Sequence, residues 1–299
     1  MKILLTGACG FTGRHFTQAA LQAQHQVVPL LANLTDPVAL AAEVAQVQPQ
    51  AVVHLAAISF VGHADDAAFY AVNTVGTTHL LAALAALPSP PTKVLIASSA
   101  NIYGNCQASP IAEDQPPAPL NHYAASKMAM EAMAHTFADR LPLIITRPFN
   151  YTGPGQALSF LIPKLVSHFA RRAPVIELGN LDVEREFNDV AMVCHAYLQL
   201  LSHGQPGQTY NVCTGVMYSL RQVVALLQDI TGHTLQVKVN PALVRANELR
   251  QLCGQPTRLN SLLQLEGEGQ GPTPPDLRHT LAQMLAAMDA SSGQWAATN

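Results

Sequence analysis

A tyrosine and a lysine stand four residues apart in the segment Tyr123-Ala124-Ala125-Ser126-Lys127. If this segment is helical, the phenol and the ammonium group lie on one face and can face the same cavity. A free phenol has a pKa of about 10 and exchanges protons poorly at neutral pH. A nearby cation is expected to lower that pKa, which suits Tyr123 to general acid–base chemistry. The same spacing also fits a helix with a buried tyrosine and a lysine on its rim, so the rest of the chain has to decide.

A glycine-rich turn near the N-terminus indicates a dinucleotide site. Gly7, Gly10 and Gly13 follow a short apolar run at residues 2–6 and precede a helical pattern that extends to about residue 23. Strand, glycine turn and helix are the context that a dinucleotide fingerprint requires. Gly7 permits the turn, Gly10 lets the backbone approach a pyrophosphate, and Gly13 lets the helix pack on the strand. The positive end of the helix then faces the phosphates.

The second expected strand, residues 26–31, lacks a common feature of NAD sites. An acidic residue at its end usually holds the adenosine ribose, and this chain has Leu31 there. Arg14, directly after the glycine turn, is placed to meet a 2′-phosphate, but it is equally a solvated helix residue. The sequence therefore leaves the choice between NADP(H) and NAD(H) open.

The alternation of strands and helices predicts an α/β fold, with a Rossmann-like, doubly wound parallel sheet. Further strands are expected at residues 51–57, 93–99 and 142–148, with helices at 38–46, 69–87 and 123–140. Because strand ends line the ligand crevice of such a sheet, Ser99 is expected to meet Tyr123 there.

The second half of the chain predicts a smaller α/β substrate domain. The boundaries are 1–150 for the dinucleotide domain, to which the chain returns at about 187–214, and 151–299 mainly for the substrate domain. The expected elements are helices 159–172, 187–203, 220–231 and 276–288, strands 175–178, 209–213 and 235–239, a loop at 266–275 and a tail at 290–299.

Composition limits the remaining classes of function. Charged residues make up 12% of the chain and the net charge is −3, which argues against a nucleic-acid surface. Met1 runs directly into an apolar strand and no apolar run is long enough to span a membrane, so we expect a cytoplasmic protein without a signal peptide. The five cysteines are scattered and include no CxxC pair. This pattern is typical of free thiols in a reducing compartment. The twelve histidines show no ligand spacing, so no metal site is predicted.

Together, the glycine turn, Ser99, the Tyr123–Lys127 pair and Arg147-Pro148-Phe149-Asn150 resemble the extended short-chain dehydrogenase/reductases that act on nucleotide sugars. The resemblance covers nearly the whole chain. It implies that Tyr123 is the catalytic acid/base, that Lys127 binds the nicotinamide ribose and lowers the pKa of Tyr123, and that Ser99 hydrogen-bonds the reacting sugar oxygen. It also implies a cofactor site formed by Gly7, Gly10, Phe11, Thr12, Gly13, Arg14, Asn33, Leu34, Leu55, Ala56, Ala57, Asn73, Tyr123 and Lys127.

Asn101 bears on the sub-class. Sugar 4,6-dehydratases of this family carry an acidic residue just after the catalytic hydroxyl, and its carboxylate removes the C5 proton. This chain reads Ser98-Ser99-Ala100-Asn101, and an amide cannot act as that base. The sequence therefore disfavours dehydration and leaves ketone reduction or 4-epimerisation.

Within the family, the loop at residues 147–156 and the segment Arg245-Ala246-Asn247-Glu248 are most similar to GDP-4-dehydro-6-deoxy-D-mannose reductases. This resemblance implies substrate contacts from Ser99, Ala100, Asn150, Arg185, Arg245 and Glu248. Two guanidinium groups suit a diphosphate, although either arginine alone also fits a surface ion pair. The chain departs from the family pattern at His122, where proline is usual, at Glu186, where aspartate is common, and at Asn33, which replaces an aspartate near the adenine.

The sequence thus predicts NAD(P)H-dependent reduction of the C4 ketone of a nucleotide-linked 4-dehydro-6-deoxyhexose, with GDP-D-rhamnose as the product. The alternatives are a 4-epimerase with tightly bound NAD, a GDP-mannose 4,6-dehydratase and a non-catalytic dinucleotide-sensing protein. The expected partner is the nucleotide sugar, with no nucleic acid and no membrane. A homodimer through the helices at 69–87 and 123–140 is also expected.

Overall fold

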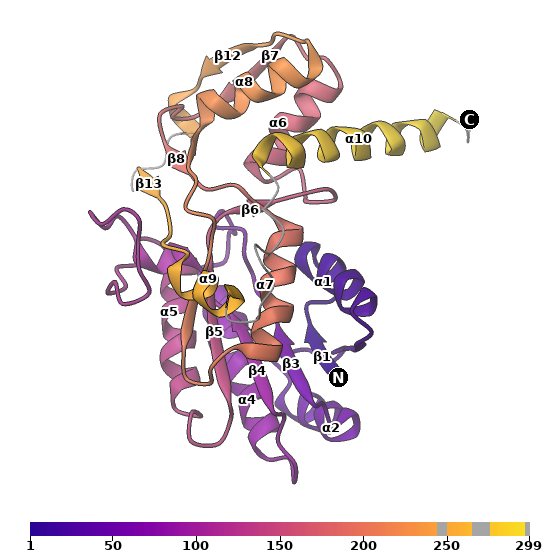
Figure 1. Ribbon diagram of the computed structural model, residues 1–299, viewed down its shortest axis with the longest axis vertical. Helices are drawn as coiled ribbons and strands as arrows, with labels where there is room; N and C mark the ends of the chain where they lie inside the picture. The colour runs from indigo at the N-terminus through magenta and orange to yellow at the C-terminus, as the bar shows by residue number, and fades with distance from the viewer. Residues whose placement is uncertain (244–249, 265–275, 297–299) are drawn as a thin grey trace.

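The computed structural model describes residues 1–243, 250–264 and 276–296. Arg245, Glu248 and the loop expected at 266–275 lie outside these ranges. The core of the molecule is a six-stranded parallel sheet (Figure 1). Its strands, in spatial order, are β10 (Thr209–Val212), β5 (Leu143–Pro148), β4 (Lys93–Ala97), β3 (Ala51–His54), β1 (Lys2–Thr6) and β2 (Gln26–Pro29).

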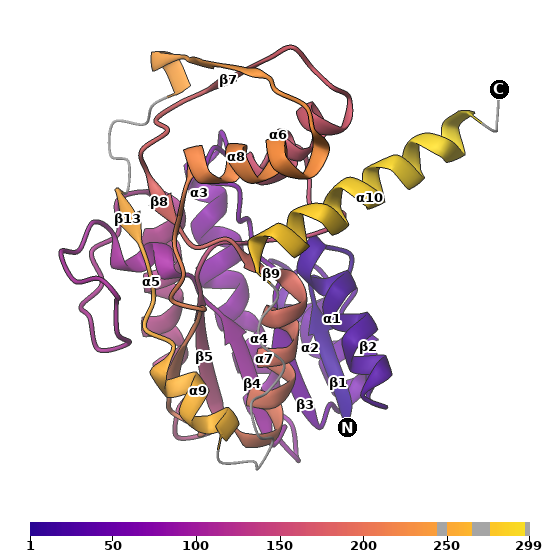
Figure 2. The ribbon, with the colours of Figure 1, turned by 45° about the horizontal axis from the view of Figure 1, so that its top comes forward.

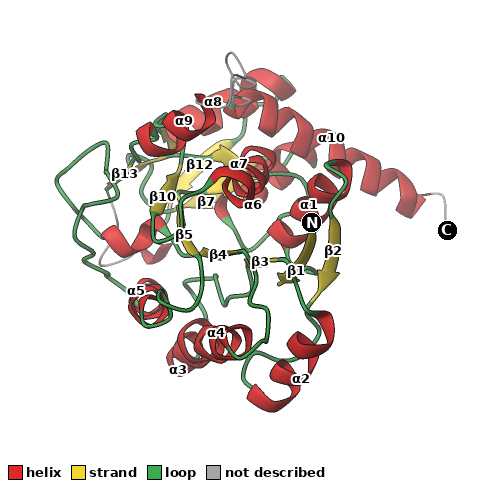
Figure 3. Ribbon diagram, turned by 60° about the horizontal axis from the view of Figure 1, so that its bottom comes forward, coloured by secondary structure: helices red, strands yellow, loops and turns green. Residues whose placement is uncertain are grey.

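Helices cover both faces of this sheet (Figure 3), which makes the fold Rossmann-like and doubly wound as predicted. One face carries α1 (Phe11–Gln22), α7 (Val190–His203) and α9 (Thr257–Gln264). The other carries α2 (Pro37–Val47), α4 (Thr77–Ala85) and α5 (His122–His135). Burial on both faces explains why the strands read as continuous apolar runs rather than as alternating patterns.

The order of the strands fixes where a ligand can bind. The chain leaves β1 toward β2 and then returns to β3 on the other side of β1. Ligands of open α/β sheets bind at such a reversal, outside the carboxyl ends of the strands. A Cβ added to Gly7, just after β1, would lie 2.8 Å from the backbone nitrogen of Ala56, just after β3. The two strand ends are therefore in close contact at the reversal point.

A second, smaller layer has its own apolar core, which includes Phe169, Leu227 and Leu281 (Figure 2). It contains α6 (Leu161–Ala170), α8 (Leu220–Thr231), the parallel pair β7 (Val175–Leu178) and β12 (Gln236–Val239), the small sheet β11 (Tyr218–Ser219), β8 (Glu184–Arg185) and β13 (Gln251–Leu252), and the start of α10 (Leu277–Ala296). Two short strands, β6 (Tyr151–Thr152) and β9 (Asn188–Asp189), join this layer to the main sheet.

Several segments differ from the sequence prediction, and α9 lies where no element was expected. The helix expected at 69–87 begins earlier, as α3 (Asp66–Phe69), passes through a π-helical segment (Tyr70–Gly76) and ends with α4. The prediction of a tail from residue 290 was wrong, because α10 continues to Ala296 and projects away from the body in Figure 2. The part of α10 that is rich in alanine, leucine and methionine ends at Met288, and the helix continues from it through residues 289–296.

A buried ion pair fixes α5 to β5. Arg147 donates from Nε to Oε1 of Glu131 (3.0 Å) and from Nη2 to Oε2 (2.7 Å). Its Nη1 donates to the Tyr103 hydroxyl (3.0 Å) and to the Glu113 carbonyl (2.9 Å). This bidentate geometry holds the helix that carries Tyr123 in one position on the sheet.

Replacing Arg147 with methionine is predicted to lower the free energy of unfolding by about 3–5 kcal/mol, because the Glu131 carboxylate is then buried without a cation. The double variant Arg147→Met/Glu131→Leu is expected to recover most of that loss. Urea denaturation of the wild type, both single variants and the double variant measures the effect. A double variant as unstable as the sum of the two singles would contradict this account.

Candidate active site

Ser99, Tyr123 and Lys127 come together where β4 ends and α5 begins. Asn121, two residues before Tyr123, caps α5 by accepting a hydrogen bond from the backbone of Ala124 (2.9 Å). Lys127 is 3% exposed and donates from Nζ to the carbonyl oxygen of Ala97, the last residue of β4 (2.7 Å). The Ser99 hydroxyl lies close enough to the Tyr123 phenol to lower its pKa. The three side chains that the sequence singled out thus occupy one buried site.

Ser99 also caps the short helical turn Ala100–Tyr103, where its Oγ accepts a hydrogen bond from the backbone of Asn101 (3.2 Å). An oxygen that accepts from Asn101 has its own proton free to donate. Capping by Ser99 therefore does not compete with a functional role of its hydroxyl. The side chain of Ala100 itself is buried in an apolar cluster, which places it behind the site.

The expected effect of Lys127 on Tyr123 is not found. Burial raises the pKa of Tyr123 above its usual value, and the hydrogen bond with Ser99 opposes this only in part. The ammonium group of Lys127 is bonded to the Ala97 carbonyl, and burial lowers its own pKa to about 8 while the charge of Glu131 opposes that shift. Tyr123 is therefore a neutral phenol at neutral pH, ready to donate a proton.

The glycine turn has the shape that a pyrophosphate needs. Gly7 has a φ of +70°, and a Cβ on Gly13 would lie 2.1 Å from the Gly7 carbonyl oxygen, so neither position accepts a side chain. Gly10 caps α1 and supplies no side-chain acceptor to the first turn. The backbone N–H groups at this positive helix end fit a dinucleotide pyrophosphate.

Tyr151 belongs to this site, although the sequence analysis did not select it. Its hydroxyl lies 2.8 Å from Thr12 Oγ1, and its ring stacks on Phe11 at 6.2 Å between centroids. Burial raises its pKa to about 12. Its position directly after Asn150, in the loop that carried the resemblance, was the available signal. Tyr151 connects the first turn of α1 with the β6 segment of the second layer.

Residues near the adenosine end of the expected cofactor site differ in exposure. Arg14 donates to the carbonyl oxygens of Cys9 (2.7 Å) and Gly155 (3.1 Å). The side chain of Leu31 is 83% exposed, whereas Leu34 is buried in the core. Asn33, which is exposed, accepts from the backbone and hydroxyl of Thr35 at 3.0 Å. Leu34 therefore supports this region from within.

Asn73 is fully buried, and its side chain has the structural role of joining two segments of the chain. Its Oδ1 accepts from the backbone of Ile58 (2.9 Å), and its Nδ2 donates to the Ile58 carbonyl (3.1 Å) and to Ser126 Oγ (3.0 Å). These bonds hold the segment after β3 against α5. Leu55 and Ala57, from the same segment, are partly exposed beside the glycine turn.

The expected substrate contacts lie on several elements. Asn150 is exposed just after β5. Arg185, in β8, is half-buried and donates to the Glu184 carbonyl oxygen (2.8 Å). The neighbouring Glu186 is fully buried and accepts from the backbone of Gly254 (2.6 Å) and Thr214 (2.8 Å), and burial raises its pKa. Glu186 thus joins β8 to two chain segments and has a structural role.

His122 lies on the rim of the site. Its Nδ1 is 3.1 Å from the Tyr70 hydroxyl and its Nε2 is 3.4 Å from Asp66 Oδ2. Both of these partners come from the helix that contains Asn73. The imidazole that replaces the usual proline therefore ties the start of α5 to that helix.

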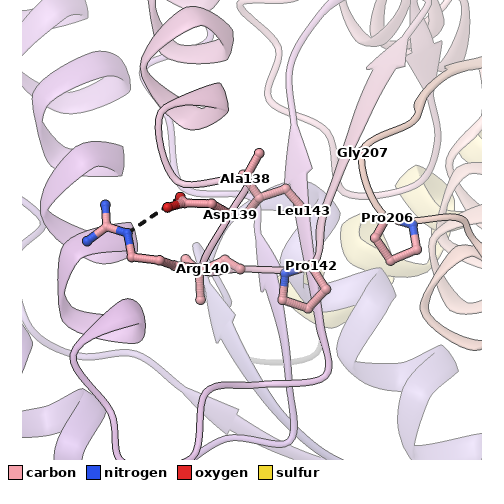
Figure 4. A pocket seen from close by; sticks show the side chains of 8 residues that line it. Ala138, Asp139, Arg140, Pro142, Leu143, Pro206 and Gly207 are labelled. Atoms are coloured by element: carbon pink, nitrogen blue, oxygen red, sulfur yellow. Dashed lines mark ion pairs between the residues drawn. The ribbon is translucent and has the colours of Figure 1, made fainter.

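A surface hollow of about 420 Å³ lies near the amino ends of β5 and β10, away from the carboxyl ends of the strands where the candidate site lies (Figure 4). It is lined by the chain around Pro142 at the start of β5 and by Pro206, and Asp139 and Arg140 form an ion pair at 3.7 Å beside it. It does not include the catalytic candidates. The described part of the chain contains no group of three side chains able to hold a metal ion, and none of its helices is long and apolar enough to cross a membrane.

Fold and site together define an α/β protein of the dinucleotide-dependent class. Residues 3–213 match the model of the NAD dependent epimerase/dehydratase family, and the chain belongs to this family. A GDP-6-deoxy-D-talose 4-dehydrogenase of Aggregatibacter actinomycetemcomitans is 36% identical over 88% of this chain and 91% of its own length. A GDP-6-deoxy-D-mannose reductase of Pseudomonas aeruginosa is 38% identical over 87% of this chain and 90% of its own.

Solved structures agree with this assignment. A putative epimerase from Burkholderia cenocepacia has a TM-score of 0.88 and 44% identity, and the match covers 97% of this chain and 98% of that one. RMD from Pseudomonas aeruginosa, solved in complex with NADPH, has a TM-score of 0.86 and 34% identity with the same coverage. The GDP-6-deoxy-D-talose 4-dehydrogenase and the GDP-6-deoxy-D-mannose reductase are oxidoreductases by name, and the family as a whole is NAD dependent.

Replacing Lys127 with methionine is predicted to stabilise the fold at pH 7 by roughly 2–3 kcal/mol, because the native state no longer buries a cation whose pKa is lowered from 10.5 to about 8. Since the unfolded chain holds this proton more tightly, wild-type stability rises between pH 8 and 10.5, and the advantage of the variant shrinks there. Urea denaturation at pH 7 and pH 10 tests this. An unstable variant at pH 7 would contradict it.

Proposed function

We propose that this protein reduces the C4 ketone of a nucleotide-linked 4-dehydro-6-deoxyhexose with NADPH or NADH. The observation that carries the proposal is the buried Ser99–Tyr123–Lys127 constellation, whose phenol is neutral and lies near the Ser99 hydroxyl. Asn101 stands where a dehydratase of this family needs a base, which supports reduction over dehydration. The two relatives named for GDP-6-deoxyhexoses support the substrate class.

The roles of the residues follow from the geometry. The nicotinamide cofactor supplies the hydride when it is bound. Ser99 donates a hydrogen bond to the C4 oxygen and polarises the ketone. Tyr123 gives its proton to the alkoxide that forms at C4. Lys127, which donates to the Ala97 carbonyl, is expected to bind the nicotinamide ribose. The glycine turn and the start of α1 hold the pyrophosphate.

GDP-4-dehydro-6-deoxy-D-mannose is the substrate that we propose, and GDP-D-rhamnose is the product. The two relatives support the GDP moiety and the 6-deoxyhexose. Their named sugars, 6-deoxy-D-talose and 6-deoxy-D-mannose, differ in configuration at C4. That configuration therefore depends on how the hexose ring lies between Ser99 and the hydride donor.

The substrate can be tested directly. GDP-4-dehydro-6-deoxy-D-mannose is generated in situ, loss of absorbance is followed with NADPH and NADH separately, and the sugar is identified by NMR. Oxidation of either cofactor with GDP-D-rhamnose as product is the expected result. GDP-6-deoxy-D-talose as product would refute the proposed configuration, and no oxidation would refute the reductase.

The second candidate function is a nucleotide-sugar 4-epimerase, which shares the same three catalytic residues. The match to a putative epimerase at 44% identity favours it. An epimerase returns the hydride to the sugar and should purify with bound NAD(H), whereas a reductase exchanges its cofactor in each turnover. Cofactor content after purification separates the two.

We also propose a cytoplasmic homodimer. Val75 and Met133 are exposed apolar residues on neighbouring helices of one face, α5 and the π-helical segment before α4. Two such surfaces are expected to pack against each other through side chains short enough for close approach. Light scattering of the purified protein should give twice the mass of the chain, and a monomer at micromolar concentration would oppose this.

Replacing Tyr123 with phenylalanine is predicted to leave cofactor affinity unchanged and to lower turnover by about 10² to 10⁴-fold, because the proton donor is lost while the ring remains. Steady-state kinetics and cofactor titration measure the two effects. Tyr210→Phe is the matched control, since that hydroxyl accepts only from the Gln205 backbone (3.0 Å). Near-normal turnover of the Tyr123 variant would refute its role.

A further inference from the structure

His54, the last residue of β3, is a buried histidine that the proposed mechanism does not use. Its side chain is only 1% exposed. Nδ1 lies 2.7 Å from the hydroxyl oxygen of Thr6, at the end of β1, and Nε2 lies 2.8 Å from the hydroxyl oxygen of Thr77, at the start of α4. Burial, reinforced by the charge of Lys127, lowers its pKa to about 3, so the ring is neutral.

The partners of the two threonines determine which ring nitrogen carries the proton. The Thr77 hydroxyl donates to the carbonyl oxygen of Asn73 (2.6 Å), so it has only acceptor capacity left for His54. Nε2 must therefore be protonated and donate to Thr77. Nδ1 is then an acceptor, and the Thr6 hydroxyl donates to it.

The oxygen of Thr6 is at the same time an acceptor of two backbone bonds. It accepts from the N–H groups of Leu55 (3.1 Å) and Ala56 (3.0 Å). If His54 were protonated on Nδ1, Thr6 would face a third donor and its own proton would lose its acceptor. The network is therefore satisfied in one state of His54, the neutral Nε2–H tautomer.

This network joins the two parts of the site. At one end, Thr6 directly precedes the glycine turn and holds the segment after β3. At the other end, the Asn73 side chain donates to Ser126 Oγ (3.0 Å), whose hydroxyl donates to the carbonyl oxygen of Tyr123 (2.8 Å). A path of hydrogen bonds, linked at one point by the covalent frame of Asn73, thus runs from the cofactor cradle through His54 to the backbone of Tyr123.

We propose that His54 is a positioning residue: as the neutral Nε2–H tautomer, it sets the distance between the cofactor cradle and the helix that carries Tyr123. It touches neither cofactor nor sugar and acts through Thr6 and Thr77. Because transfer of hydride and proton is sensitive to misplacement, a small relative shift of these two parts lowers turnover and cofactor affinity together. The effect on turnover rests on the function proposed above, whereas the tautomer and the cofactor affinity do not.

The tautomer is tested first, by long-range ¹H–¹⁵N spectroscopy of the histidine rings at pH 5 to 8. His54→Gln identifies the signals of His54 by their loss. Thr77→Val, which keeps the histidine, is expected to shift its Nε2–H signal and serves as a second assignment if the glutamine variant does not fold. The expected result is a protonated Nε2 and a bare Nδ1 throughout. A protonated Nδ1, or titration of the ring within this range, would overturn the proposal.

The positioning role is tested with variants that remove one bond at a time. His54→Asn retains a group near Nδ1 for Thr6, and Thr77→Val removes the partner of Nε2. Each is expected to weaken binding of NADP⁺ or NAD⁺ and to lower kcat, both by about tenfold. Both changes break the same bond between His54 and Thr77. The cofactor affinity and kcat of the double variant should therefore be only slightly lower than those of the more impaired single variant.

Thr280→Val is the matched control. Thr280 lies in the C-terminal helix α10, and its buried hydroxyl donates to Asp189 Oδ2 (2.7 Å). The variant makes the same change of side chain, threonine to valine, as Thr77→Val. Cofactor affinity and kcat within twofold of wild type are expected for it. Equal losses in Thr77→Val and Thr280→Val, or none in Thr77→Val, would overturn the proposal. Cofactor titration needs no sugar, so this arm stands even if the proposed substrate is not turned over.

Discussion

A lysine ammonium group buried beside a phenol is the constraint on which the site depends. Lys127 is held by the Ala97 carbonyl at 2.7 Å, and the charge of Glu131 partly offsets the cost of its burial. Glu131 is in turn fixed by two hydrogen bonds from Arg147. The strand that ends beside the sugar site therefore also orders the helix that carries the catalytic candidates. Arg147, which belongs to the motif that carried the family resemblance, thus has a structural role: it holds α5 against β5.

Three contacts from the second layer close the cradle formed by the first. Tyr151 meets the start of α1, and Arg14 reaches the carbonyl oxygen of Gly155. Phe60, after β3, packs edge-on against Phe160 at the start of α6, with 6.0 Å between ring centroids. A cofactor between the layers would thus be held by segments far apart in the sequence.

Local patterns predicted the regular elements well, and the bounds of β7 and α8 match those of the structure. They did less well for residues whose role depends on packing. The side chains of Leu34 and Asn73 are buried, and this burial depends on elements distant in sequence that local patterns do not reveal. The pKa of Tyr123 was expected to fall, but Lys127 is bonded to the strand. No periodicity reveals that carbonyl oxygen as its partner.

The central claim is net hydride transfer to C4 of a nucleotide sugar, and a deuterium label tests it most directly. The enzyme is supplied with GDP-4-dehydro-6-deoxy-D-mannose and NADPH or NADH deuterated at both C4 positions of the nicotinamide. The account predicts one deuterium at C4 of every product sugar and consumption of one cofactor for each. Unlabelled product formed without consumption of added cofactor, with NAD(H) retained by the protein, would contradict the account and favour epimerisation.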